Sequence, residues 1–273
     1  MSIAQHFQSA GLSFGGEKFQ APDWAKRLKI DVGLSYSASN SIEWIRRDSD
    51  LMVLGLEPVP ESVRQLRAHI EAQPDKDRIL KQLFIIPVAL GLEPKDANFY
   101  VTDNDPSSSS LLEPSTFPVS QVITVPVFTL RQVIGLIPMH HFGRIDHLKL
   151  DCQGFDLDII KGSKDLLSHV AVVTAEAEQG QYLNSHNDVE SLEKYMTSLG
   201  FVFFNRRSRI RIWVGTFLAK FRVLNKLRIR LPYLNHRDAK SDRLAVEVQD
   251  PTFLNPVFMA DIKNGSITAF QEG

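Results

Sequence analysis

Cysteine, long apolar runs and an excess of charge of either sign are all scarce in this sequence. Its 273 residues contain a single cysteine, Cys152, so no disulfide can form within the chain. The most apolar run, residues 83–92, contains Pro87 and is about half as long as the roughly 18–20 residues that a membrane span needs. The first thirty residues lack the apolar centre of a secretory signal. We therefore expect a protein that works in the reducing cytoplasm and does not span a membrane.

The charges nearly cancel, with 31 Lys and Arg against 32 Asp and Glu and a formal net charge of −1. A chain with this balance has no overall attraction to nucleic acid or anionic lipid, so such a partner would need a local basic patch. Hydrophobic residues make up 43% and charged residues 23%, which is typical of globular proteins and excludes a disordered or collagen-like chain. At this length one large domain can bury a core without disulfides.

Short apolar runs alternate with stretches suited to helices. This alternation is typical of βαβ units. The sequence therefore predicts an α/β fold, a doubly wound, Rossmann-like sheet of mainly parallel strands with helices on both faces. We predict strands at 28–32, 51–56, 83–90, 147–150, 170–175 and 201–204, and helices within 40–45, 60–70, 155–167 and 188–199.

Two regions interrupt the alternation. Residues 99–130 are rich in Ser, Pro and Asp, which predicts an exposed loop that could cover a substrate. Residues 206–230 carry nine Lys and Arg and no acid between Arg206 and Arg230, and their apolar residues share one face of a helix. We predict an N-terminal extension at 1–27, the core at 28–205, a basic amphipathic insertion at 206–247, and a strand that returns to the core within 248–273.

The basic insertion has three alternative interpretations. It could be a helix packed on the core with a solvated basic face, or a lid or dimer element beside the acceptor site. It could also be a peripheral contact to an anionic membrane or a lipid-linked glycan carrier, because such a contact would use both faces of the helix. Nucleic acid is the least favoured partner, and the oligomeric state is left open.

The first predicted strand ends in Asp31-Val32-Gly33, and a helix follows at Asn40-Ser41. A turn of small residues before a helix lets backbone come close to a nucleotide-like ligand. The glycine pattern of nicotinamide and flavin sites is missing, since Gly33 stands alone. A carboxylate at position 31 favours a cationic cofactor instead, and S-adenosylmethionine carries both a sulfonium and an amino group.

Glu57 ends the second predicted strand and is followed by Pro58. An acid at this position of a βαβ unit can accept two hydrogen bonds from ribose hydroxyls. Asp31 and Glu57 would then hold opposite ends of one ligand. Together with Gly33 they predict a cofactor site at the carboxyl ends of the first two strands.

These segments, in this order, resemble the FkbM-type S-adenosylmethionine-dependent methyltransferases. The resemblance covers about residues 28–205, and the segments that carry it are Asp31-Val32-Gly33, Leu56-Glu57-Pro58, Pro87-Val88-Ala89-Leu90, Thr129-Leu130, residues 145–154 (IDHLKLDCQG), residues 158–162 (DIIKG) and Glu176. It implies that Asp31 and the turn from Gly33 to Ser37 hold the methionine part of the cofactor. It also implies that Glu57 holds the ribose and that Val88 and Ala89 lie near the adenine.

The chain departs from the family pattern at two places. Leu34-Ser35 and Ser37 stand where the family usually has Ala-Asn and a second Gly, and Gln153 stands where an acid is common. Our predicted cofactor contacts are Asp31, Gly33, Ser35, Ser37, Ser41, Glu57, Pro58, Val88 and Ala89.

Methyl transfer to a hydroxyl needs alignment and a group that takes the proton. Asp151 is the first candidate because it ends the fourth strand, and Glu176 ends the fifth. For the acceptor we predict contacts from Asp103, Asn104, Ser109 and Glu178. No metal is expected, because the spacing of the acids does not require one.

The sequence thus predicts a methyltransferase that uses S-adenosylmethionine to methylate a hydroxyl of a glycan or small molecule. Two alternatives remain at this point. The chain could be a non-catalytic cofactor-binding or scaffold protein of the same fold, or a nucleotide-using oxidoreductase.

Overall fold

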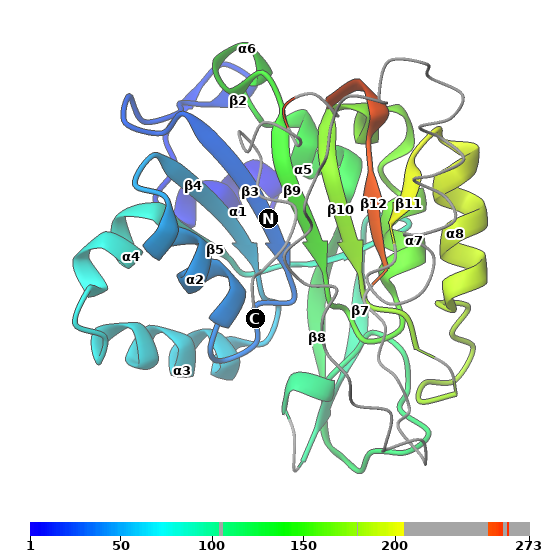
Figure 1. Ribbon diagram of the computed structural model, residues 1–273. Coiled ribbons are helices and arrows are strands. Elements are labelled where there is room, and N and C mark those ends of the chain that lie inside the picture. Colours follow the sequence, from blue (N-terminus) through cyan, green and yellow to red (C-terminus); the bar gives the residue numbers. More distant parts are fainter. Residues whose placement is uncertain (104–105, 179, 205–250, 259–260, 262–273) are drawn as a thin grey trace, which may run out of the picture.

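The computed structural model describes residues 1–103, 106–178, 180–204, 251–258 and 261 (Figure 1). The predicted basic insertion, residues 206–247, lies outside these described ranges, and so does Asn104. Within them, no helix is both long enough and apolar enough to cross a membrane.

A mixed seven-stranded sheet forms the centre of the fold (Figure 1). Its strand order is β11-β12-β10-β9-β3-β4-β5. The strands from β10 to β5 run parallel, whereas β12 is antiparallel to both of its neighbours. The strands are β3 (Arg27–Val32), β4 (Leu51–Leu56), β5 (Leu83–Ile86), β9 (Ile145–Leu150), β10 (Val170–Ala175), β11 (Val202–Phe204) and β12 (Thr252–Leu254).

Helices cover both faces of this sheet, which confirms the predicted α/β fold class. The sheet has an apolar core on each face, because successive side chains of a strand point to opposite faces. In β4, Leu51 and Val53 belong to one core, and Met52 and Leu54 belong to the other. The first core is closed by α2 (Ser39–Arg47), α3 (Pro60–Glu71) and α4 (Lys76–Gln82). The second is closed by α1 (Ile3–Ser9), α5 (Leu130–Gly135), α6 (Met139–Phe142), α7 (Asp156–Lys161) and α8 (Val189–Ser198).

The helix starts follow local sequence signals. Thr129 accepts a hydrogen bond from the backbone N–H of Gln132, whose side chain accepts one from the N–H of Thr129, so the two form a capping box for α5. Asp188 caps α8 by accepting from the N–H of Ser191, and α3 begins at Pro60. Helix α2 has no side-chain cap, and Ala38 before it is in the left-handed conformation, with φ of 44°. The turn before α2 is therefore held by other contacts.

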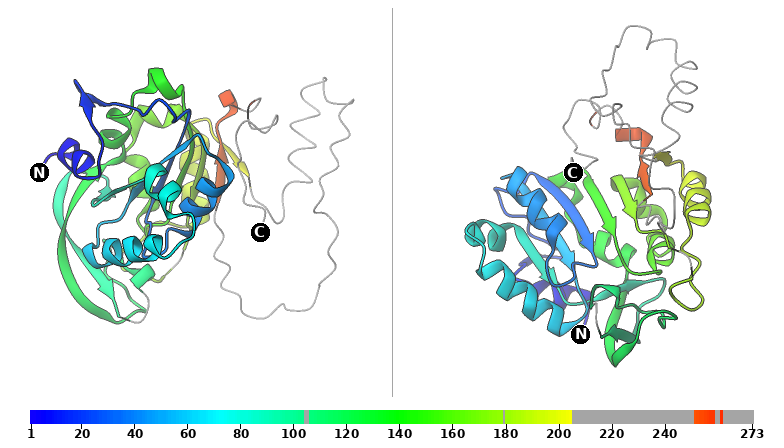
Figure 2. Two further views of the ribbon diagram at one scale, coloured as in Figure 1. Left: turned by 90° about the vertical axis from the view of Figure 1, so that its left-hand side faces the viewer. Right: turned by 60° about the horizontal axis from the view of Figure 1, so that its bottom comes forward.

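A second, three-stranded sheet of order β6-β8-β7 stands at the carboxyl edge of the main sheet (Figures 1 and 2). It consists of β6 (Ala89–Gly91), β7 (Lys95–Thr102) and β8 (Val119–Thr129), with the short 3₁₀ turn η1 (Pro106–Ser108) between the last two. Phe99 and Val101 of β7 pack against Val125 and Val127 of β8. The expectation of one long loop over 99–130 is thus wrong, because alternate apolar residues at its two ends pair as antiparallel strands.

Two further boundaries differ from the predicted ones. The single strand expected at 83–90 is divided at Pro87 into β5 of the main sheet and β6 of the second sheet, since proline cannot donate a ladder hydrogen bond. The helix expected at 155–167 ends at Lys161 and continues after Gly162 as the 3₁₀ helix η2 (Lys164–His169). At Gly162 a Cβ would lie only 2.6 Å from the carbonyl oxygen of Gly91, so a residue with a side chain would not fit there without a shift.

The remaining short strands, β1 (Phe14–Gly15) and β2 (Lys18–Phe19), form a hairpin near the N-terminus, away from the carboxyl edge. The chain runs from β3 outward to β4 and β5 and then returns to β9 and β10 on the other side of β3. The loop after β3 therefore leads toward β4 on one side, and the loop after β9 leads toward β10 on the other side. Sheets of this kind bind their ligands in the crevice outside that point.

Gly33, the first residue after β3, packs against the backbone that follows β9. Its φ is +84°, and a Cβ there would overlap the carbonyl oxygen of Asp151. Only glycine combines this backbone conformation with so close a contact. This approach brings the loop after β3 against the residue that follows β9.

We expect Gly33→Ala to lower the free energy of unfolding by about 3 kcal/mol, because it adds both backbone strain and a steric overlap. Gly16→Ala is the matched control, since Gly16 also has a positive φ, +73°, but nothing lies within 4 Å of the position that a Cβ would take there. The control should lose only about 1 kcal/mol. Urea unfolding of both variants measures this, and equal losses would contradict the proposed close contact.

Candidate functional site

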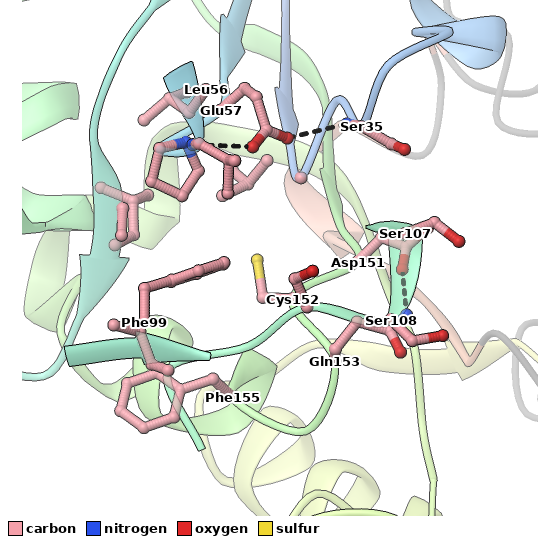
Figure 3. A pocket seen from close by; sticks show the side chains of 18 of the residues that line it. Ser35, Leu56, Glu57, Phe99, Ser107, Ser108, Asp151, Cys152, Gln153 and Phe155 are labelled. Atoms are coloured by element: carbon pink, nitrogen blue, oxygen red, sulfur yellow. Dashed lines mark hydrogen bonds between the residues drawn. The ribbon is translucent and has the colours of Figure 1, made fainter. Parts of the chain in front are cut away.

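A cavity of about 360 Å³ opens at the carboxyl ends of β3, β4, β9 and β10 (Figure 3). This volume is within the range of sites for small molecules. Among the described residues that line it, the charged ones are all acidic: Glu57, Asp151 and Glu176. Phe99 and Phe155 lie together at one end of the cavity, while Ser35 and Ser107 lie across it (Figure 3). The site thus has an apolar part and an acidic, hydroxyl-bearing part.

Glu57 is held by backbone from two directions. One carboxylate oxygen accepts from the N–H of Ser35 at 2.9 Å, and the other from the N–H of Val59 at 3.0 Å. Ser35 has a positive φ of 55°. Burial raises the pKa of Glu57 to about 7 despite these two hydrogen bonds. Each carboxylate oxygen keeps one lone pair for a ligand hydroxyl.

Lys149 lies between two carboxylates below the cavity. Its Nζ is 3.4 Å from Oδ1 of Asp31 and 3.1 Å from Oδ2 of Asp151. The other oxygen of Asp31 accepts a hydrogen bond of 2.6 Å from the hydroxyl of Ser41, at the start of α2. Burial alone would lower the pKa of Lys149, but the two carboxylates raise it above its ordinary value. Lys149 therefore joins the ends of β3 and β9 electrostatically.

Asp151 and Glu176 share one donor. The side-chain nitrogen of Gln153 lies 2.9 Å from Oδ1 of Asp151 and 2.6 Å from Oε2 of Glu176. Burial pushes the pKa of Asp151 upward, but the charge of Lys149 and side-chain hydrogen bonds with Glu176, Gln153 and Lys149 hold the pKa below its ordinary value. Asp151 is consequently ionised at neutral pH, and its side chain is 39% exposed toward the opening.

A buried network supports the loops after β9 and β10. Asp156 is fully buried and accepts from the N–H of Cys152 at 3.1 Å and from the amide of Asn187 at 3.0 Å. The same amide donates to the carbonyl oxygen of Glu176 at 2.6 Å. Burial and the nearby charge of Asp151 raise the pKa of Asp156 to about 7. Asn187 thereby fixes the backbone of Glu176 relative to that of Cys152.

Two segments, 106–118 and 180–185, form a roof at the cavity mouth. The hydroxyl of Tyr182 contacts the carbonyl oxygen of Ser108 at 2.6 Å, and Ser110 donates to the carbonyl oxygen of Gln153 at 2.7 Å. Backbone hydrogen bonds from Ser115 to Gln181 and from Leu183 to Glu113 join the segments directly. The two segments of the roof are thus joined to each other and to the loop after β9.

The structure brings most of the predicted site residues to this cavity. Its lining includes Gly33, Ser35, Glu57, Pro58, Val88, Ala89, Ser109, Asp151 and Glu176. The lining does not include Asp31, Ser37, Ser41, Asp103 or Glu178. Asp31 and Ser41 lie behind it and act on Lys149, and Glu178 is buried with a pKa raised to about 7, first by burial and then by Asp151.

Sequence reasoning assigned no role to three residues that organise the site: Lys149, Gln153 and Tyr182. A signal for Lys149 was present, because a lysine between Leu148 and Leu150 of a central parallel strand must find an anion. No comparable signal exists for Tyr182, whose partners are Ser108 and Gln153, 74 and 29 residues away.

Lys149→Met should lower the free energy of unfolding by about 3 kcal/mol at pH 7.5, because it leaves Asp31 buried without its cation. The low pKa of Asp151 contributes stability above its unfolded pKa, and this contribution disappears as the pH falls. The loss in the variant should therefore shrink toward pH 4.

Lys161→Met is the control, since Lys161 pairs with Asp158 at the surface, where an ion pair contributes little. Denaturant unfolding at both pH values measures the effect. A loss for Lys149→Met that does not depend on pH would exclude the electrostatic role.

Comparison with known proteins supports one family. The model of the methyltransferase FkbM domain matches residues 24–203. Among solved structures, a methyltransferase FkbM from Methylobacillus flagellatus KT is 15% identical with a TM-score of 0.44, over 72% of this chain and 44% of that chain. The methyltransferase domain of bacterial CtHen1 is 12% identical with a TM-score of 0.33, over 67% of this chain and 81% of that chain.

No curated protein matches the chain. The chain spans less than half of the length of the Methylobacillus structure that it matches. The family match covers residues 24–203, which include strands β3 to β10 and every described residue that lines the cavity. The chain belongs to the FkbM methyltransferase domain family.

Proposed function

We propose that the chain methylates a hydroxyl of a glycan or small molecule and takes the methyl group from S-adenosylmethionine. The observation that carries this proposal is the Glu57 carboxylate, which backbone N–H groups fix at the end of β4 beside a cavity with acidic charged residues. An acidic wall favours a cation over a pyrophosphate. This supports a sulfonium cofactor over a nicotinamide dinucleotide.

The residues present fit such a cofactor. Glu57 keeps free lone pairs that can accept the two ribose hydroxyls. Val88 and Ala89 line the apolar part of the cavity, where an adenine ring would find no charge. The absence of a side chain at Gly33 leaves the backbone of the first turn open to the methionine part. The cofactor, when bound, supplies a methyl group on a positively charged sulfur.

The chain's own part is to position the acceptor and to receive its proton. Asp151 is ionised at neutral pH, exposed toward the cavity and held by Lys149 and Gln153. It can therefore accept a hydrogen bond from the acceptor hydroxyl, fix its direction and take the proton as the new bond forms. Ser107, Ser108 and Ser109 line the cavity from the roof, and a polar lining of this kind suits a polyhydroxylated acceptor.

Calorimetric titration with S-adenosylmethionine and S-adenosylhomocysteine, with NAD as the control, tests the proposal first. We expect saturable binding of the two sulfur compounds and none of NAD. Binding of NAD alone would support the oxidoreductase alternative, and binding without transfer to any glycan or hydroxylated compound would support the scaffold alternative.

Cofactor affinity should depend on pH through Glu57. Ligand hydroxyls donate to the ionised carboxylate, and the pKa of Glu57 is about 7. Affinity for S-adenosylhomocysteine should therefore fall about tenfold between pH 8 and pH 6. Glu57→Ala should bind weakly at both pH values, and a variant that kept the pH dependence would assign it to another group.

Asp151→Asn should separate binding from transfer. The variant keeps the shape of the side chain but removes the proton acceptor, so methyl transfer should fall by about 100-fold or more. Affinity for S-adenosylhomocysteine should change by less than about threefold, since Glu57 is untouched. Radiolabelled methyl transfer and calorimetry measure the two effects, and a parallel loss of both would make Asp151 a cofactor ligand instead.

A further inference from the structure

Gln153 lines the acidic part of the cavity, between Asp151 and Glu176. In the sequence it was noted only as a residue that differs from the family pattern. It follows Asp151 and Cys152 in the loop after β9 (Figure 3). Its φ is +51°, a conformation that costs energy in any residue with a side chain other than Asn or Asp. A strained backbone conformation of this kind persists only where several surrounding contacts hold it in place, and it is common at functional sites.

The contacts that hold Gln153 use both ends of its amide. The nitrogen has two hydrogens, and its two acceptors are Asp151 at 2.9 Å and Glu176 at 2.6 Å. The amide oxygen lies 2.8 Å from the hydroxyl of Tyr182, and the main-chain oxygen accepts from Ser110. The side chain thus joins two carboxylates on one side to the roof on the other.

Two carboxylates within reach of one nitrogen atom repel each other, and one of them would normally take up a proton. A donor shared between them offsets part of this repulsion, because each carboxyl group receives one hydrogen bond. Lys149 adds a positive charge, but its ion pairs are with Asp151 and Asp31. Gln153 reaches Glu176 as well, through the same nitrogen that contacts Asp151.

We propose that Gln153 is the positioning residue of the site: its amide holds the carboxyl groups of Asp151 and Glu176 side by side and ties them to the roof over the acceptor. The role in catalysis rests on the methyl transfer proposed above. The electrostatic role does not, because it depends on the fold alone.

The other titratable groups near this pair must be considered in any pH experiment. They come from every element packed around it: Asp31 of β3, Lys149 of β9, Cys152 after β9, Asp156 of α7, and Glu178 and Tyr182 after β10. A variant at position 153 leaves all of them in place. A difference in pH dependence between variant and parent chain is then caused by the bridge.

Gln153→Glu keeps the shape but replaces the donor with a third carboxylate. Clustered carboxylates have raised pKa values in the folded state, so stability is present at low pH and is lost as the pH rises through those values. We expect the melting temperature to drop by about 6 °C at pH 8 and by less than about 2 °C at pH 5, relative to the parent chain.

Gln65→Glu is the matched control. Gln65 also donates to a carboxylate, that of Glu61 at 2.8 Å, but the pair lies exposed on α3. Water screens the added charge there, so its melting temperature should change by less than about 1 °C at either pH.

Gln153→Met keeps the proposal testable if Gln153→Glu does not fold, because it removes the bridge without adding charge. We expect a smaller loss of stability that again grows from pH 5 to pH 8. A loss of equal size at both pH values in the Met variant would overturn the proposal and leave Gln153 with a packing role.

Methyl transfer by Gln153→Met separates the two halves of the proposal. Without the donor, the carboxylate pair takes up a proton at higher pH, so the acid limb of the rate profile should move upward by about one pH unit. An unmoved rate profile, together with the expected stability result, would overturn the catalytic role alone. If the parent chain transfers no methyl group, the proposed function fails, and the melting experiment still decides whether the bridge exists.

Discussion

The site depends on one cation, the ammonium group of Lys149, which lies between the carboxylates of Asp31 and Asp151. Strands β3 and β9 are neighbours in the sheet, and each places an acid near its carboxyl end, at the point where the loops part. Without a positive charge between them, these acids would repel each other across the crevice. The lysine turns that repulsion into a contact that holds the two strand ends together.

The remaining features of the site follow from this contact. The backbone of Gly33 lies against the carbonyl oxygen of Asp151, whose side chain Lys149 holds, and Ser35, two residues further on, donates to Glu57. On the other side, Gln153 extends the arrangement from Asp151 to Glu176. The result is a row of carboxyl groups with fixed partners, of which Glu57, Asp151 and Glu176 line one cavity.

Much of the fold was predictable from the sequence because parallel strands that are buried on both faces consist of short runs of apolar residues. Residues 51–56 and 170–175 were predicted with the bounds that the structure shows, since both faces of these strands are covered. The pairing of β7 with β8 was not predictable in the same way. Their partners face each other across a stretch rich in Ser and Pro, and no local pattern marks which residues meet.

The site residues likewise fall into a group that was predictable from the sequence and a group that was not. Residues at strand ends, such as Glu57 and Asp151, were predictable because the carboxyl edge of a parallel sheet gathers them. Contacts that depend on a loop conformation, such as the positive φ of Gln153 and the approach of Tyr182, arise from tertiary structure. Asp31 was predicted at the right strand end, but its side chain faces Ser41 and Lys149 behind the cavity.

The hairpin of β7 and β8 has a consequence for how such a protein can change over time. It is an antiparallel unit of adjacent segments with its own small apolar core, inserted between β6 and α5, and its strands take no part in the pairing of the main sheet. Its tip can therefore lengthen, shorten or change composition without disturbing the strands that carry Glu57 and Lys149. In such a chain, the choice of acceptor can diverge as long as Ser108 and Ser110 keep their contacts with Tyr182 and Gln153.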